Sequence, residues 1–189
     1  MWGEEMGKDK AKQTRKAILQ AASSLVYKEG VNKLTLEAVA KRAGVSKGGL
    51  LYHFSNKDIL IAELVKCANE EYVNDIRELA NQDMNQRGKW TRAVIQAATS
   101  EEEYNRIENF GSGLLAAMAT NPDLLTEIQK QYVSIQNEIE HDGLDAVEAT
   151  IARLAVDGLY YADMFSVAPI RGELREKVVN RLMKMTKEE

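Results

Sequence analysis

The sequence predicts an all-α protein, with an N-terminal three-helix helix-turn-helix domain and a C-terminal helical domain. Only two of the 189 residues are proline, and apolar residues recur three and four positions apart, as on the buried face of a helix. The charge divides unevenly: residues 1–60 hold 11 Lys and Arg against 6 Asp and Glu, and the remainder holds 14 against 23. This distribution favours a protein that binds a polyanion with its N-terminal part.

The first element expected is a helix over residues 11–29, preceded by a flexible polar tail over residues 1–10. Ile18, Ala22, Leu25 and Val26 recur at helical spacing and form its apolar stripe. Gly30 stands where a helix commonly ends, because glycine adopts the left-handed conformation of a C-terminal cap without steric cost.

Two short helices follow, over residues 35–43 and 46–52. Thr35 and Ser46 are suitable N-caps, and Glu37 lies in the first turn, where the helix dipole favours an anion. Gly44 permits the left-handed turn between them. A longer helix is expected to start after Ser55 or Asn56 and to continue to about residue 79.

The remaining sequence predicts further helices, separated by segments rich in Gly, Pro and Asn. They are expected over residues 89–98, 103–120, 123–139, 145–165 and 172–187. We therefore divide the chain into the tail (1–10), a helix-turn-helix DNA-binding domain (11–57), and an effector-binding and dimerisation domain (58–189).

The segment from Thr35 to Lys57 carries the functional signal. Two short helices joined at a glycine form a helix-turn-helix, with Val45, Leu50 and Phe54 expected to face inward. In such a motif the N-terminus of the second helix enters the major groove of DNA. Two glycines after Lys47 would let the backbone approach the DNA closely.

The run Ala43-Gly44-Val45-Ser46-Lys47-Gly48, followed by Leu50, Tyr52-His53-Phe54 and Lys57, resembles the N-terminal signature of the bacterial tetracycline-repressor (TetR) family. The resemblance covers roughly residues 10–60. It implies a homodimer in which each recognition helix enters one half-site of a pseudo-palindromic operator in double-stranded DNA.

The resemblance also implies roles for individual residues. Phosphate contacts are expected from Thr35, Tyr52, His53 and Lys57, and Lys47 and Gly48 are expected near bases or the adjoining backbone. The full predicted DNA-facing set is Thr35, Arg42, Ser46, Lys47, Gly48, Gly49, Leu51, Tyr52, His53 and Lys57. Gly49 and Leu51 depart from the family pattern, since larger or polar side chains often read bases there. Specificity is therefore expected to depend on contact between Leu51 and a thymine methyl group and on DNA shape.

The C-terminal part predicts a dimer interface. Residues 154–165 hold only two charged residues, so this helix should be covered on both sides, by its own domain and by a second subunit. The resemblance to one TetR subgroup implies that the last two helices form a four-helix bundle across the dimer. The predicted interface residues are Leu154, Gly158, Phe165, Val178 and Leu182. The alternative is an ordinary buried helix within a monomer.

A cavity for a small-molecule effector is expected among the middle helices, because aromatic and methionine side chains can line an adaptable apolar pocket. The candidates are Trp90, Tyr104, Phe110, Met118, Tyr132, Asp157 and Tyr161. For any one of these apolar residues a place in the hydrophobic core is the competing interpretation. Asp157 either caps or bridges helices or meets a cationic ligand.

The leading hypothesis is a dimeric transcriptional repressor that an unidentified effector releases from its operator. The alternatives are an effector-independent DNA-binding protein or activator, and a helical small-molecule-binding protein or enzyme. An enzyme is not expected, because no nucleophile, phosphate loop or metal-ligand spacing is recognisable; no metal or other cofactor is expected either. The lone Cys67 excludes an internal disulfide, and no apolar run is long enough to cross a membrane, so a cytoplasmic location is expected.

Overall fold

The computed structural model describes residues 2–101, 103 and 122–187. Within these residues the chain forms eight α-helices, one 3-10 helix and no strand, which confirms the all-α class. The helices are α1 (Trp2–Glu29), η1 (Val31–Lys33), α2 (Leu36–Ala43), α3 (Lys47–His53), α4 (Lys57–Gln82), α5 (Lys89–Ala98), α7 (Pro122–Glu140), α8 (Ala146–Met164) and α9 (Gly172–Met185). None of the described helices is both long enough and apolar enough to cross a bilayer.

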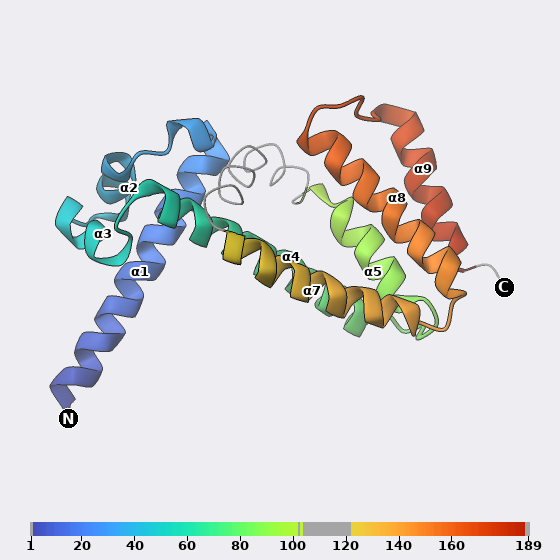
Figure 1. Ribbon diagram of the computed structural model, residues 1–189, viewed down its shortest axis with the longest axis horizontal. Coiled ribbons are helices and arrows are strands. Elements are labelled where there is room, and N and C mark those ends of the chain that lie inside the picture. Colours follow the sequence, from blue (N-terminus) through green and yellow to red (C-terminus); the bar gives the residue numbers. More distant parts are fainter. Residues whose placement is uncertain (1, 102, 104–121, 188–189) are drawn as a thin grey trace.

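The helices are arranged in two groups joined by α4 (Figure 1). Helices α1, α2 and α3 lie at one end of the molecule, and α5, α8 and α9 lie at the other. Helix α4 packs against α1 and also against α5, while α7 lies along α4. Helix α5 contacts α4, α7, α8 and α9, so it forms the centre of the C-terminal group.

The expected tail over residues 1–10 is a correction to the sequence prediction, because α1 already begins at Trp2. Glu4, Glu5, Met6 and Lys8 are good helix formers, and no proline interrupts the segment. The helix therefore continues through the two glycines of this segment, and α1 projects beyond the rest of the N-terminal group (Figure 1).

Most other boundaries follow local capping. Thr35, Ser46, Asn56 and Asp145 each accept a backbone N–H within the first turn of α2, α3, α4 and α8, at 2.9–3.1 Å. Helix α5 has the predicted bounds, and α4 extends three residues beyond the predicted end at residue 79. The 3-10 turn η1 was not expected. The predicted helix over residues 103–120 lies outside the described residues, apart from Glu103.

The N-terminal hydrophobic core joins α1, α2, α3 and the first half of α4. Its largest fully buried side chains are Ile18, Leu34, Leu50, Phe54 and Leu60. The core extends along α4 to Val65, and Ile128 of α7 packs against it. The N-terminal group is therefore in direct hydrophobic contact with both α4 and α7.

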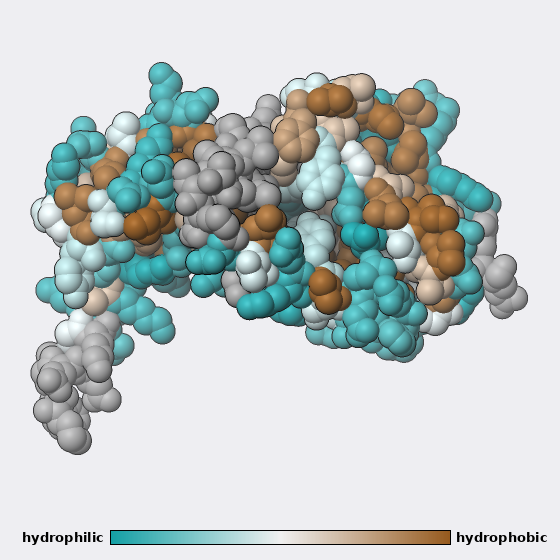
Figure 2. All heavy atoms as spheres, viewed as in Figure 1, coloured by the Kyte–Doolittle hydropathy of each residue, from teal (hydrophilic) through white to brown (hydrophobic). Residues whose placement is uncertain are grey.

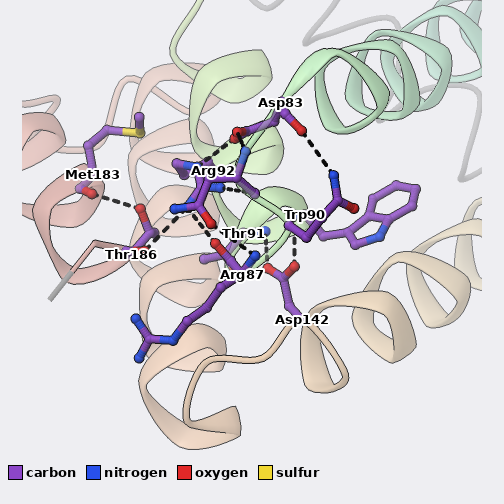
Figure 3. Close-up of polar contacts among 10 residues, drawn as sticks. Asp83, Arg87, Trp90, Thr91, Arg92, Asp142, Met183 and Thr186 are labelled. Carbon is purple, nitrogen blue, oxygen red and sulfur yellow. Dashed lines mark hydrogen bonds and ion pairs between the residues drawn. The ribbon is translucent and has the colours of Figure 1, made fainter. Parts of the chain in front are cut away.

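A buried polar network joins the end of α4 to α5, α9 and the loop between α7 and α8 (Figure 3). The buried Arg92 guanidinium donates to the Asp83 carboxylate at 2.6 Å and to the carbonyls of Asn85, Arg87 and Thr186. The buried Asp142 carboxylate accepts from the backbone N–H groups of Trp90 and Thr91 and from the Thr91 hydroxyl. Helix α5 begins at Gly88, which has no side chain to cap it, so Asp142 supplies the cap from another part of the chain.

Candidate nucleic-acid interface

The corner between α2 and α3 has the geometry of a helix-turn-helix. Gly44 adopts the left-handed conformation, with φ of 67° and ψ of 30°, and its N–H donates to the carbonyl of Lys41. Val45 N–H then donates to the carbonyl of Ala40 at 3.0 Å, which closes the end of α2. A side chain at position 44 would strain this turn, so the sequence favours glycine here.

Helix α3 is fixed by a cap at its start and by two apolar anchors. Ser46 Oγ accepts from Gly49 N–H at 3.0 Å. Leu50 and Phe54 are fully buried in the N-terminal core, as the sequence predicts. The Arg15 guanidinium lies 5.2 Å from the centre of the Phe54 ring and also pairs with Glu63 of α4 at 2.6 Å. These contacts hold α3 rigidly against α1 and α4.

The opposite side of α3 faces solvent. Tyr52 is 82% exposed and Leu51 is 37% exposed, which is unusual for large apolar or aromatic side chains. Lys47 and Gly48 are also exposed, and a side chain at position 48 would meet nothing within 4 Å. This side of α3 therefore presents one cation, one aromatic ring and one apolar side chain on an otherwise smooth helix.

Two of the predicted DNA-facing cations have acidic neighbours. Lys47 Nζ lies 2.6 Å from Glu37 Oε1, and the Arg42 guanidinium lies 4.0 Å from the Glu29 carboxylate. The hydrogen bond from Lys47 lowers the pKa of Glu37 below its ordinary value, so this carboxyl is ionised at neutral pH.

The remaining predicted phosphate contacts lie around α3. Thr35 Oγ1 caps α2, which still leaves its hydroxyl hydrogen available for an external acceptor. The half-buried His53 ring meets the Tyr52 ring edge-to-face, with 5.1 Å between the centroids. Lys57 is the first residue of α4, directly after the Asn56 cap. Together with α3, these residues form one continuous polar and cationic surface.

Helix α8 has two different sides. Ala149, Ala152, Val156 and Leu159 are buried against the other helices. Its other side carries six exposed positions at alternating spacings of four and three: Val147, Ile151, Leu154, Gly158, Tyr161 and Phe165. We call these six residues the outer face of α8. Figure 2 shows hydrophobic side chains gathered over α8 and the segment that follows it.

The structure corrects part of the predicted dimer interface. Leu154 is 54% exposed on the outer face, but Leu182 is only 6% exposed, because it fills the core between α5, α8 and α9. Val178 packs against the same core. Helix α9 turns this stripe inward, so neither residue presents a surface comparable to that of Leu154. A side chain at Gly158 would meet open space, since nothing lies within 4 Å.

The predicted effector-binding residues do not all lie together. Trp90 packs against the core between α4, α5 and α7, which is the competing interpretation. Tyr161 belongs to the outer face of α8, where its ring stacks on Phe165 with 6.2 Å between the centroids. Tyr104, Phe110 and Met118 lie outside the described residues. Tyr132 and Asp157 remain near each other.

Tyr132 and Asp157 belong to a group that also contains Tyr72, Tyr160 and Glu103, which we call the tyrosine cluster. Burial, and to a smaller extent the neighbouring charges of this cluster, raises the pKa values of Tyr72 and Tyr132 well above their ordinary range. Burial also raises the pKa of Asp157, although Asp157 pairs with Arg153 at 2.6 Å. The cluster therefore combines buried aromatic rings with two carboxyl groups between α4, α7 and α8.

Sequence reasoning missed several members of both sites. It did not include Tyr72, Tyr160 or Glu103 among the candidate effector residues. It placed Glu37 only at the helix dipole and assigned no role to Arg15. Each of these residues acquires its neighbours from a helix other than its own, so no spacing within one helix could indicate them.

The fold and this surface define a helix-turn-helix protein with a larger helical domain. Residues 18–64 match the family model of bacterial regulatory proteins of the tetR family, and residues 88–187 match the tetracyclin repressor-like C-terminal domain. The second match alone covers more than half of the chain. The chain therefore belongs to the TetR family, as the residues around Gly44 predict.

Individual relatives agree with this assignment. The transcriptional regulator TtgR of Pseudomonas putida is 36% identical over 76 residues, which are 40% of this chain and only 36% of TtgR. The transcriptional repressor KstR of Mycolicibacterium smegmatis is 27% identical over 170 residues, which are 88% of this chain and 74% of KstR.

Solved structures share the fold along most of the chain. A transcriptional regulator from Rhodococcus sp. Rha1 has a TM-score of 0.65 at 20% identity, with 92% of this chain and 94% of that chain covered. The multidrug binding protein EbrR, solved in complex with ethidium, has a TM-score of 0.60 at 20% identity, with coverage of 91% and 98%.

Proposed function

We propose that this chain is a dimeric transcriptional repressor that binds a pseudo-palindromic operator through α3 and is released by a small-molecule effector. The observation that carries the proposal is the division of α3 into two sides. Leu50 and Phe54 are buried in the core, whereas Lys47, Leu51 and Tyr52 face solvent. A short, rigidly held helix with an exposed cationic start is suited to the major groove.

Recognition by α3 would combine a few phosphate contacts with little direct reading of bases. Tyr52, Lys57 and Thr35 supply donors at the rim of the surface, and such contacts fix the position of a protein on DNA. Gly48 and Gly49 offer no side chain for base edges, and Leu51 offers only apolar contact. Sequence preference would therefore rest on Lys47, on a thymine methyl group and on DNA shape.

The outer face of α8 is the proposed dimer interface. Its exposed apolar residues follow one side of a helix whose other side is already buried within the protomer. Exposure of a continuous apolar stripe to water is unfavourable, and a second copy of the chain can cover it in a two-fold arrangement. Gly158, in the middle of this face, would let the two helices approach closely.

The proposed route from effector to operator runs through α4. This helix starts beside α3, pairs with α1 through Arg15 and Glu63, and contributes Tyr72 to the tyrosine cluster. Ile128 of α7 packs against the N-terminal core, so α7 also reaches the DNA-binding domain. A ligand that changes the spacing of α4 and α7 would reorient both recognition helices of the dimer and lower operator affinity.

The tyrosine cluster is the proposed effector site, and its chemistry suits a cationic aromatic ligand. Aromatic rings and carboxylates both attract cations, more strongly where water is excluded. EbrR has been solved with ethidium and with malachite green, so these two cations are suitable probes.

Footprinting on the DNA that flanks the gene tests the DNA-binding proposal. We expect two protected half-sites whose centres are one helical turn, or a multiple of it, apart. Tyr52→Ala should abolish protection. Tyr27→Ala removes an exposed tyrosine of α1 outside the predicted DNA-facing set and should not. Failure of the natural chain to protect any palindrome would overturn the proposal.

Titration with ethidium or malachite green tests the effector site separately. Binding should raise the melting temperature and weaken operator binding. Asp157→Asn should weaken cation binding at least threefold, whereas the exposed Glu148→Gln should not. If neither cation binds, the effector class is wrong, and the DNA-binding result stands independently.

A further inference from the structure

Glu37 and Lys47 form an ion pair beside the surface that the proposed function turns toward DNA. Glu37 lies in the first turn of α2, and Lys47 is the first residue of α3. Their side chains are 64% and 61% exposed, yet Glu37 Oε1 and Lys47 Nζ are only 2.6 Å apart. The residues are ten positions apart in the sequence, so the folded corner at Gly44 brings them together.

Lys47 is the only lysine or arginine of α3. The two residues that follow it are glycines, and Leu51 is apolar, so the cationic charge of the recognition helix is concentrated in this one side chain. An ammonium group paired with a carboxylate attracts a phosphate much less than a bare ammonium group does, because the two charges largely cancel at a distance. Glu37 therefore controls how much of this charge DNA meets.

We propose that Glu37 is a positioning residue that determines specificity, because it holds Lys47 in place and masks its charge from DNA other than the operator. The proposal rests on DNA binding by α3. Binding to unrelated DNA depends almost entirely on phosphate attraction, to which a masked ammonium adds little.

On the operator, Lys47 would donate to a base edge, such as the O6 or N7 of guanine, from a position already defined by Glu37. A free lysine side chain must lose the freedom of its four-carbon stem when it binds, and the ion pair has already restricted that freedom. Glu37 thus weakens binding to unrelated DNA without weakening operator binding, which increases the ratio between the two affinities.

The test compares Glu37→Gln with the natural chain on the operator and on a scrambled duplex of equal length, by fluorescence anisotropy at several salt concentrations. Binding to the scrambled duplex should tighten about threefold or more, and its salt dependence should steepen by up to about one unit. Operator binding should not tighten, so the specificity ratio should fall at least threefold.

Glu173→Gln is the matched control. It removes the same charge and breaks an exposed ion pair of similar geometry, Glu173 with Lys177 at 2.7 Å, on α9. The control should leave the specificity ratio unchanged. Exposed pairs contribute little to stability, so both variants should melt within a few degrees of the natural chain.

A second background shows whether Glu37 acts through Lys47. In a chain that already carries Lys47→Gln, the change Glu37→Gln should have no further effect on the ratio. An effect that persists there, an unchanged ratio in the single variant, or an equal loss in Glu173→Gln would overturn the inference. A natural chain that prefers no operator over scrambled DNA would overturn the proposed function as well, and that arm is measured first.

Discussion

Replacement of Asp142 by alanine should destabilise the protein far more than replacement of Asp145, although each carboxylate accepts two backbone N–H groups at a helix N-terminus. Asp145 caps its own helix, α8, and is exposed. Asp142 caps α5 across 51 residues of sequence, is buried, and also accepts from the Thr91 hydroxyl at 2.8 Å. The comparison isolates burial and tertiary context from the cap itself.

The expected magnitudes follow from these partners. Loss of an exposed N-cap such as Asp145 costs about 1 kcal/mol. Asp142→Ala leaves the N–H and hydroxyl of the buried Thr91 without their acceptor, and each unsatisfied group costs roughly 1–3 kcal/mol. Relief from burying a carboxylate returns part of that cost. We expect a net loss of about 3 kcal/mol, or a melting temperature lower by roughly 6–12 °C.

Urea unfolding followed by circular dichroism at 222 nm measures both losses. The protein concentration must be the same for each variant, because the proposed dimer makes apparent stability depend on it. The slope of free energy against urea should be unchanged, which would show that both variants reach the same folded state. Losses that agree within about 0.5 kcal/mol would refute the argument that Asp142 contributes through tertiary burial.

Three further predictions concern pH, assembly and DNA. The hydrogen bond from Arg92 lowers the pKa of Asp83, so this pair stabilises the fold above the ordinary aspartate range, about pH 4, and the contribution is lost below it. Asp83→Asn should therefore lower the urea midpoint at pH 7 and not at the lowest pH where the protein folds; a constant deficit would contradict this. Leu154→Glu should give a monomer of unchanged helicity by light scattering, and a persistent dimer would exclude the outer face of α8. Lys57→Ala should weaken binding to all DNA and reduce the salt slope by about one unit, whereas Leu51→Ala should change sequence preference and not the slope. Equal effects on both measures would mean that Leu51 is not the groove-facing residue.

Local features of the fold could be predicted because they depend on residues within one turn. Thr35 and Ser46 cap the helices that follow them, and Gly44 adopts the left-handed turn between α2 and α3. The start of α1 was wrong because a polar composition alone does not distinguish a flexible tail from an exposed helix. In that segment, helix-forming residues outweighed the glycines.

The candidate sites were less predictable from the sequence. The apolar stripe of α9 indicated a buried side without indicating what covers it, and the structure turns Leu182 into the protomer's own core. Tyr161 was expected in a pocket but stacks on Phe165 at the surface. Helical spacing tells which residues share a side of a helix, whereas the partner of that side depends on how the helices pack.

The sequence by itself determined the helix-turn-helix, its caps and the side of α3 that carries Lys47, Leu51 and Tyr52. Tertiary structure decided that Glu37 masks Lys47 and that Asp142 caps α5, whose own first position is a glycine. The physical reason is the range of the interactions. A cap or turn acts over three or four residues of one segment, whereas these ion pairs and hydrogen bonds join segments that only packing brings together.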